Sequence, residues 1–386
     1  MIPYGRQQIT SDDIAAVSAV LTSDFLTQGP MVPAFEQAIA AYVGVRYAVA
    51  CNSATSALHL ACLALGLGAG DRLWTSPISF VASANCARYC NADVDFIDVD
   101  THTGLISLDA LADKLQDAAR QQQLPKIIVV VHLAGHSMDM AAVAALTSPY
   151  GIALIEDASH AVGAHDGVAF VGACRYSACT IFSFHPVKLI TSAEGGMLLT
   201  QDKQLADRAA LLRSHGISRD AYMMTEPSHG AWYYQQRELG FNYRLTDLQA
   251  ALGLSQLTRL ESFIQRRHQL VLQYQQLLAH LPLEVPPFPQ MGRSSWHLFI
   301  IRLHDETRRA QVFDRLRQAG IGVNVHYIPI HTQPYYQQLG FCWGDFPQAE
   351  QFYSQIISLP LHPSLSDEEQ LHVVRVLEQA LAVTHT

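Results

Sequence analysis

The sequence predicts an α/β protein with a large domain on a mostly parallel sheet and a smaller C-terminal α/β domain. Over the first two thirds of the 386 residues, short apolar runs alternate with helical patterns, which is typical of βαβ units. Beyond about residue 245, a long helical stretch leads to a proline-rich break and a second α/β pattern. We therefore place the large domain in residues 1–250 and the small domain in residues 251–386.

The expected elements follow in chain order. Short apolar runs predict strands at 47–51, 72–75, 94–99, 126–131, 152–156, 179–183 and 195–199. A helix is expected at 53–65, and helices or turns are expected at 108–122 and 140–149. In the small domain we expect a helix at 246–278, a break at Pro282, Pro286, Pro287 and Pro289, a strand at 297–303, a helix at 306–319, a strand at 321–327 and a helix at 367–383.

Composition excludes several classes of protein. With 49% hydrophobic and 15% charged residues, the chain is not intrinsically disordered. Its net charge of -9 argues against sequence-independent nucleic-acid binding. No apolar run approaches the roughly 18 to 20 residues that span a bilayer, and no signal-peptide pattern occurs. The seven cysteines form no CxxC pair. We expect a soluble, reduced, cytoplasmic protein without nucleic-acid or membrane partners.

One of only four lysines occupies a position suited to covalent chemistry. Lys188 lies in a polar loop after the apolar strand 179–183, and the loop closes on the glycine pair 195–196. A lysine beside an apolar strand can have a lowered pKa and attack a carbonyl as a free amine. A surface lysine on a turn explains the same pattern, so the residues alone leave both interpretations open.

Two further positions suggest a ligand site. Asp157 ends the apolar strand at 152–156, and open α/β sheets bind ligands beyond the carboxyl ends of their strands. A carboxylate there can keep a pyridinium nitrogen protonated, or it can simply cap the next helix. The helix start at 53–55 suits a phosphate, although an ordinary Ser/Thr N-cap is commoner. Walker, GxGxxG, HExxH and GxSxG patterns are missing, so we expect no metal, nicotinamide or serine-hydrolase chemistry.

Five motifs together resemble a known family. They are residues 52–58, 75–85, 156–163, 183–196 and 240–253. In this order and spacing they resemble the DegT/DnrJ/StrS nucleotide-sugar aminotransferases, over essentially the whole chain. The resemblance implies the fold type I of pyridoxal-phosphate (PLP) dependent transferases, which is aspartate aminotransferase-like. It also implies that the large domain binds PLP and that the protein is a homodimer with shared active sites.

The resemblance assigns roles to individual residues. Lys188 forms the Schiff base with PLP and carries the proton between the reacting carbons. Asp157 pairs with the pyridine nitrogen, His160 approaches the ring hydroxyl, and Phe80 stacks on the ring. The implied phosphate ligands are Ala54, Thr55, Ser183 and, from the neighbouring subunit, Asn242. Sugar 3-dehydratases of the same fold carry histidine in place of the lysine, so Lys188 favours transamination.

A subgroup is also suggested by the segments 26–30, 75–80, 213–216 and 325–330. These resemble the transaminases that form UDP-4-amino-4,6-dideoxy-N-acetyl-β-L-altrosamine in pseudaminic acid biosynthesis. The resemblance implies L-glutamate as amino donor and UDP-2-acetamido-2,6-dideoxy-β-L-arabino-hexos-4-ulose as acceptor. The implied substrate-binding residues are Tyr4, Thr27, Gln28, Gly29, His326, Tyr327, Ile328 and Pro329. Ile328 stands where the subgroup has lysine, which removes a cation from beside the diphosphate.

Two alternatives stay open at this point. The first is an aminotransferase of the same family that acts on a different 4-keto nucleotide sugar, such as the D-configured UDP-4-keto-6-deoxy-GlcNAc. The second is a catalytically silent protein of the PLP fold with a regulatory role. The presence of both Lys188 and Asp157 counts against the second alternative.

Overall fold

The centre of the protein is a seven-stranded sheet in which only one strand runs against the others. The computed structural model describes residues 1–289 and 292–382. The sheet order is β1-β7-β6-β5-β4-β2-β3, and β7 pairs antiparallel with both of its neighbours. The strands are β1 (Tyr47–Cys51), β2 (Arg72–Thr75), β3 (Asp93–Phe96), β4 (Ile127–Val131), β5 (Ala153–Asp157), β6 (Cys179–Ser183) and β7 (Gly196–Thr200). This arrangement confirms the predicted mostly parallel sheet.

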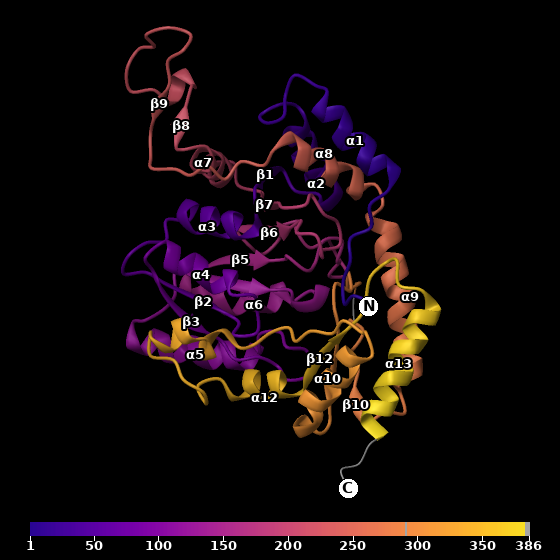
Figure 1. The fold of residues 1–386 in the computed structure, drawn as a ribbon. Coiled ribbons are helices and arrows are strands. Elements are labelled where there is room, and N and C mark those ends of the chain that lie inside the picture. The colour runs from indigo at the N-terminus through magenta and orange to yellow at the C-terminus, as the bar shows by residue number, and fades with distance from the viewer. Residues whose placement is uncertain (290–291, 383–386) are drawn as a thin grey trace.

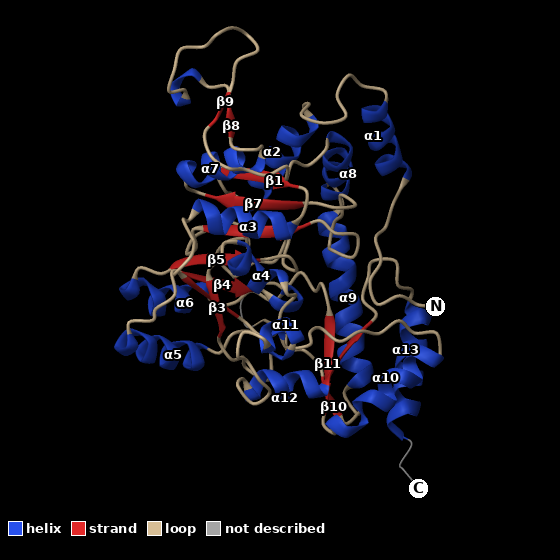
Figure 2. Cartoon of the chain, turned by 60° about the vertical axis from the view of Figure 1, so that its left-hand side comes forward, coloured by secondary structure: helices blue, strands red, loops and turns tan. Residues whose placement is uncertain are grey.

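Helices cover both faces of this sheet, as Figures 1 and 2 show. Alternate side chains along each strand point to opposite faces, so the apolar strands are buried on both sides. One face packs against α3 (Ala54–Ala64), α4 (Ala82–Tyr89) and α7 (Lys203–Arg213). The other packs against α2 (Met31–Val43), α5 (Leu108–Gln121), α6 (Met140–Thr147) and α8 (Asp247–Leu257). The N-terminal α1 (Ser11–Leu21) lies on α8.

The smaller part of the protein has its own sheet and core. Its three strands are β10 (Leu283–Glu284), β11 (Phe299–Leu303) and β12 (Ile356–Leu359), in the order β10-β11-β12. Its helices are α9 (Leu260–Leu278), α10 (Arg309–Gln318), α11 (Pro334–Gln337), α12 (Pro347–Gln355) and α13 (Asp367–Ala382). In Figure 1, α9 and α13 run side by side along the outer edge. The domain division at residue 250 falls inside α8 and stays a prediction.

Two expected elements of the small domain are wrong. The helix predicted at 246–278 is broken at Thr258 and Arg259, where Arg259 leaves the helical region and the Thr258 hydroxyl donates to the Ser255 carbonyl at 2.7 Å. The stretch 321–327 forms isolated bridges instead of a strand. There the Asn324 side chain accepts the N–H of Val325 at 2.8 Å, which removes a donor from any strand pairing. The predicted end of the last helix, Val383, lies outside the described residues.

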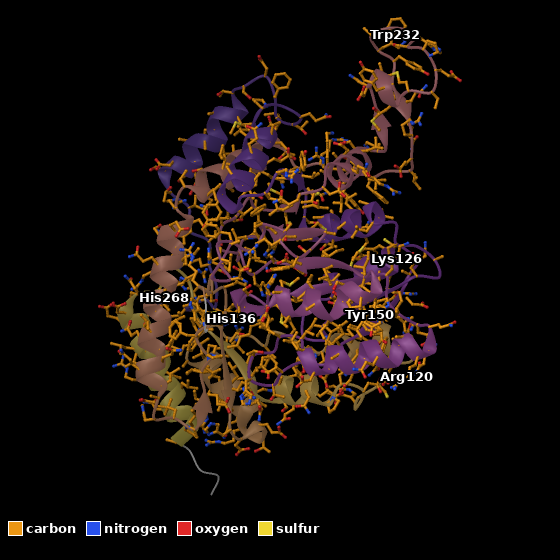
Figure 3. The ribbon with its side chains drawn as sticks, turned by 180° about the vertical axis from the view of Figure 1, so that it is seen from behind. Arg120, Lys126, His136, Tyr150, Trp232 and His268 are labelled. Carbon is orange, nitrogen blue, oxygen red and sulfur yellow. The ribbon has the colours of Figure 1, made fainter. Side chains whose placement is uncertain are left out.

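An arm that the sequence did not predict projects from the large domain. The short strands β8 (Ile217–Ser218) and β9 (Gln235–Gln236) form its base. Figures 1 and 2 show the chain between them extending away from the body, and Figure 3 places Trp232 at its far end. Tyr222 is 99% exposed and Trp232 is 74% exposed. In the part of the chain that is described, no helix is long and apolar enough to cross a membrane.

The contact between α2 and α8 depends on a glycine. A Cβ on Gly253 would lie 2.6 to 3.1 Å from three ring carbons of Phe35, whose side chain is fully buried. We expect Gly253→Val to lower the free energy of unfolding by about 1–3 kcal/mol through overpacking. Gly253→Ala should cost less, because alanine gains about 1 kcal/mol of helix propensity. Urea unfolding measures both, and an unchanged midpoint for the valine variant would contradict the contact.

Candidate active site

A cavity of about 520 Å³ lies at the carboxyl ends of β5 and β6, facing the first turns of α3 and α4. Its volume is within the usual range of small-molecule sites. The cavity is lined by eleven of the residues that the sequence singled out: Tyr4, Ala54, Thr55, Phe80, Asp157, His160, Ser183, Lys188, His326, Tyr327 and Ile328. These residues are brought together from both the large and the small parts of the protein.

The Lys188 amine lies in this cavity without an ion-pair partner among the described residues. It follows the turn that begins at His185, whose carbonyl accepts the Lys188 N–H at 2.9 Å. Burial lowers the pKa of Lys188 to about 8, and the negative charge of Asp157 opposes this shift. The other three lysines make ion pairs with Asp95, Asp71 and Asp207. A fraction of Lys188 is therefore a neutral, nucleophilic amine near neutral pH.

Asp157 is held in place by two serine hydroxyls. Ser83 donates to one carboxylate oxygen at 2.6 Å, and Ser159 donates to the other at 2.6 Å. The side chain is 6% exposed, so its orientation is fixed inside the cavity wall. Sequence reasoning missed both serines. The contact between Ser159 and Asp157 could have been predicted from the sequence, because an aspartate and a serine two residues apart often form a hydrogen-bonded turn. Ser83 is 74 residues from Asp157 in the sequence, and no local pattern predicts their contact.

The N-terminus of α3 forms part of the cavity wall. Ser53 caps this helix by accepting the N–H of Ser56 at 3.1 Å. The N–H groups of Ala54 and Thr55 belong to the first turn and have no intrahelical acceptor, so they can bind an anion. A Cβ on Gly196 would overlap the backbone of Ser53 and Ala54, so only glycine lets β7 approach the helix this closely.

Two pairs of side chains join different segments of the chain at the cavity wall. His160 Nε2 lies 3.0 Å from the hydroxyl of Tyr327, and their rings stack with centroids 6.0 Å apart. His326 Nδ1 lies 2.7 Å from the hydroxyl of Ser358. Burial, together with the charge of Lys188, lowers the pKa of His326 to about 3. His326 is therefore neutral at physiological pH.

Phe80 and Ile328 form the open rim of the cavity. Phe80 is 57% exposed, and its ring centroid lies 6.4 Å from that of Tyr327. Ile328 is 47% exposed. The apolar Ile328 side chain places no cation at this rim. Pro329 is buried and does not line the cavity.

Four of the predicted site residues lie away from the cavity of their own chain. Asn242 is exposed and forms a backbone bridge with Ser214. Thr27 and Gln28 are exposed, and Thr27 bridges to Thr246. Gly29 packs closely on Asp247 and Phe25. Their roles in cofactor or substrate binding stay predictions.

Comparison with known proteins gives consistent matches over the whole chain. The model of the DegT/DnrJ/EryC1/StrS aminotransferase family matches residues 7–378. The spore coat polysaccharide biosynthesis protein SpsC of Bacillus subtilis is 38% identical over 382 residues, which cover 97% of this chain and 96% of SpsC. Among solved structures, Helicobacter pylori PseC, an aminotransferase involved in the biosynthesis of pseudoaminic acid, has a TM-score of 0.90. It is 31% identical, and the match covers 98% of this chain and 99% of PseC.

A second neighbour was solved in PMP, PLP and apo forms. The putative sugar aminotransferase Spr1654 of Streptococcus pneumoniae is 28% identical in both its PLP and PMP forms. The TM-scores are 0.88 for the PLP form and 0.89 for the PMP form. The matches cover at least 98% of this chain and 99% of each neighbour.

The lowered pKa of Lys188 predicts selective chemistry. In cofactor-free protein treated with formaldehyde and a mild hydride, we expect Lys188 to be methylated with a pH midpoint of about 8. Lys203, whose pKa is raised by Asp207, should require a higher pH. Asp157→Asn should move the Lys188 midpoint lower, because the carboxylate favours the charged amine. Peptide mass spectrometry measures each site, and equal midpoints for Lys188 and Lys203 would contradict the assignment.

Proposed function

The chain belongs to the DegT/DnrJ/EryC1/StrS aminotransferase family, and on that premise we propose that it transfers the amino group of L-glutamate to C4 of a UDP-linked 4-keto-6-deoxy-N-acetylhexosamine. It is a PLP-dependent sugar aminotransferase. The proposed acceptor is UDP-2-acetamido-2,6-dideoxy-β-L-arabino-hexos-4-ulose, in pseudaminic acid biosynthesis. The similarity to PseC supports this acceptor.

The observation that carries the proposal is the placement of Lys188, Asp157 and the α3 N-terminus around one cavity. These groups fit PLP, because an amine, a carboxylate and an anion site match its aldehyde, its pyridine nitrogen and its phosphate. When bound, PLP supplies a carbonyl that accepts amines and a ring that withdraws electrons from the reacting carbon. Ser183 and the first turn of α3 would hold the phosphate, and Asp157 would hold the ring nitrogen.

The side chains that line the cavity have different roles in a transamination. The Lys188 amine is neutral in part near pH 8, so it can accept the proton from the α-carbon of glutamate in the first half-reaction. In the second half-reaction its ammonium form can donate a proton to C4 of the sugar. Asp157, fixed by two serines, keeps its charge directed at one position. The neutral state of His326 leaves Lys188 as the basic group in this part of the cavity.

A homodimer with shared active sites is part of the proposal. Lys188 is the only Lys or Arg among the described residues that line the cavity, although the proposed acceptor carries a diphosphate. Asn242, Thr27 and Gln28 are exposed and lie outside their own chain's cavity. The exposed aromatic residues of the arm also suit a contact with another chain. A second copy of the chain would supply what one cavity lacks.

The glutamate half-reaction tests the amino-transfer proposal. We expect PLP-loaded protein to lose its yellow absorbance on addition of L-glutamate and to release 2-oxoglutarate in proportion to the protein. Lys188→Ala should keep the fold but slow this release by at least about a thousandfold, because it removes both the nucleophile and the proton carrier. Lys188→Arg is the charge-retaining control. Release of 2-oxoglutarate by Lys188→Ala at the wild-type rate would refute the assignment.

The sugar acceptor is tested separately with enzyme that has first reacted with L-glutamate, so that its cofactor carries the amino group. We expect the L-arabino 4-ketosugar to restore the yellow absorbance and to yield an aminated UDP-sugar detectable by mass spectrometry. The D-configured UDP-4-keto-6-deoxy-GlcNAc is the matched alternative. Faster reaction with the D-configured sugar would replace the proposed acceptor but keep the aminotransferase. A protein that binds PLP and reacts with neither glutamate nor either sugar would favour the silent regulatory alternative.

Complementation tests the shared site. If Asn242 of one chain serves the cofactor of the other, Lys188→Ala and Asn242→Arg are each inactive alone. When equal amounts of the two variants are unfolded and refolded together, about half of the dimers are mixed, and each mixed dimer has one intact site of two. We therefore expect about one active site in four to be restored. The same mixing with Lys188→Ala alone is the control. No recovery in dimers that mass spectrometry shows to be mixed would contradict the sharing.

A further inference from the structure

The small domain contacts the active-site wall through one tight junction. Residues 294–298, which lead into β11, lie against Ala134 and Gly135 at the end of β4 and against the backbone of His160. A Cβ on Gly135 would lie 2.5 Å from the Ser295 hydroxyl and 3.0 Å from the His160 carbonyl oxygen. Only glycine therefore allows these three segments to meet.

The junction holds Ala134 in an unusual backbone conformation. Ala134 has a φ of 59°, in the left-handed region that non-glycine residues rarely adopt. Its carbonyl accepts the N–H of His297 at 2.8 Å, and the Gly135 carbonyl accepts the N–H of Ser295 at 3.1 Å. Contacts from residues 295–297 therefore hold the two peptide groups that follow Ala134.

The N–H of Ala134 itself points at the His160 ring. The Ala134 N–H donates to His160 Nδ1 at 3.2 Å, and this bond is buried. A ring nitrogen that accepts a hydrogen bond carries no proton, so the single proton of the neutral ring is on Nε2. The contact of 3.0 Å with Tyr327 is therefore Nε2–H donating to the hydroxyl oxygen.

Other neighbours oppose any second proton on this ring. The His297 ring lies 4.4 Å from the His160 ring, and the Ser295 hydroxyl donates to the His160 carbonyl at 2.9 Å. Burial lowers the pKa of His160 well below its ordinary value, and the positive charge of Lys188 adds to this effect. Among the described residues, the titratable groups facing His160 are Lys188, His297, His326 and Tyr327. Asp157 lines the same cavity, but its carboxylate is bonded to Ser83 and Ser159 and not to the His160 ring.

We infer that Ala134, Ser295 and His297 are positioning residues that lock His160 in its neutral, Nε2-protonated form. His160 then donates its one ring N–H to the Tyr327 hydroxyl and takes no part in proton transfer. Resting on the proposed function, the proton of the transamination would therefore be carried by Lys188 and not by His160. The small domain thereby sets the protonation state of a residue that belongs to the large one.

The first experiment reads the tautomer directly. Full-length protein without cofactor is labelled with 15N-histidine, and the His160 signals are assigned by their loss in His160→Gln. We expect the Nε2–H tautomer, with no change from about pH 6 to about pH 8, where an ordinary histidine titrates. An Nδ1–H tautomer, or an imidazolium that appears within this range, would overturn the inference.

A matched pair of variants tests the cause. Ala134→Gly keeps the N–H and tolerates the positive φ, so His160 should keep the wild-type signature. In Ala134→Val a β-branched residue disfavours that φ, so we expect His160 to titrate with a midpoint moved toward its ordinary value of about 6.5. If Ala134→Val does not fold, Ser295→Ala replaces it, because this change adds no atoms. In Ser295→Ala we also expect the His160 midpoint to move toward about 6.5. A wild-type signature in the folded valine variant, or in Ser295→Ala, would overturn the positioning role.

These measurements separate the two proposals. They need neither PLP nor substrate, so a locked His160 in a protein that fails to react with glutamate would refute the proposed function alone. An active aminotransferase whose His160 titrates near pH 6.5 would refute the lock alone.

Discussion

The burial of one amine opposite one carboxylate is the interaction around which the active site is organised. The cavity lowers the pKa of Lys188 to about 8, and the charge of Asp157 prevents a larger shift. A free amine and a fixed negative charge therefore coexist near neutral pH, which covalent catalysis on a carbonyl requires. The serine contacts to Asp157 keep that charge in place whatever enters the cavity.

The sheet supplies this interaction because of its topology. Asp157 and Ser183 are the last residues of neighbouring parallel strands, so both face the same edge. The antiparallel β7 brings Gly196 back to that edge, beside the start of α3. The directions of β1, β5, β6 and β7 thus place three groups around one cavity. These groups are the N–H groups of the first turn of α3, the Asp157 carboxylate and the loop that carries Lys188. Family membership and this geometry agree on a PLP-dependent sugar aminotransferase.

The histidines on the far wall depend on a different constraint, the close approach of the two domains. His160 belongs to the large domain, but its ring and carbonyl are contacted by His297 and Ser295 of the small one. A change in how the domains meet would therefore alter hydrogen bonding inside the cavity without touching Lys188.

The sequence by itself determined the seven strands of the central sheet, their mostly parallel arrangement and the positions of Lys188 and Asp157, because apolar runs that end in polar residues are local patterns. It also indicated the α3 start, where Ser53 is a local cap. The break at Arg259 and the bridges at Asn324 were decided by side chains that compete for backbone groups, and the strand and helix periodicities do not record such competition. Only the tertiary structure brought Ser83 to Asp157 and Ala134 to His160. Those contacts depend on chain segments that meet across the fold, with directions set by packing and by a left-handed residue.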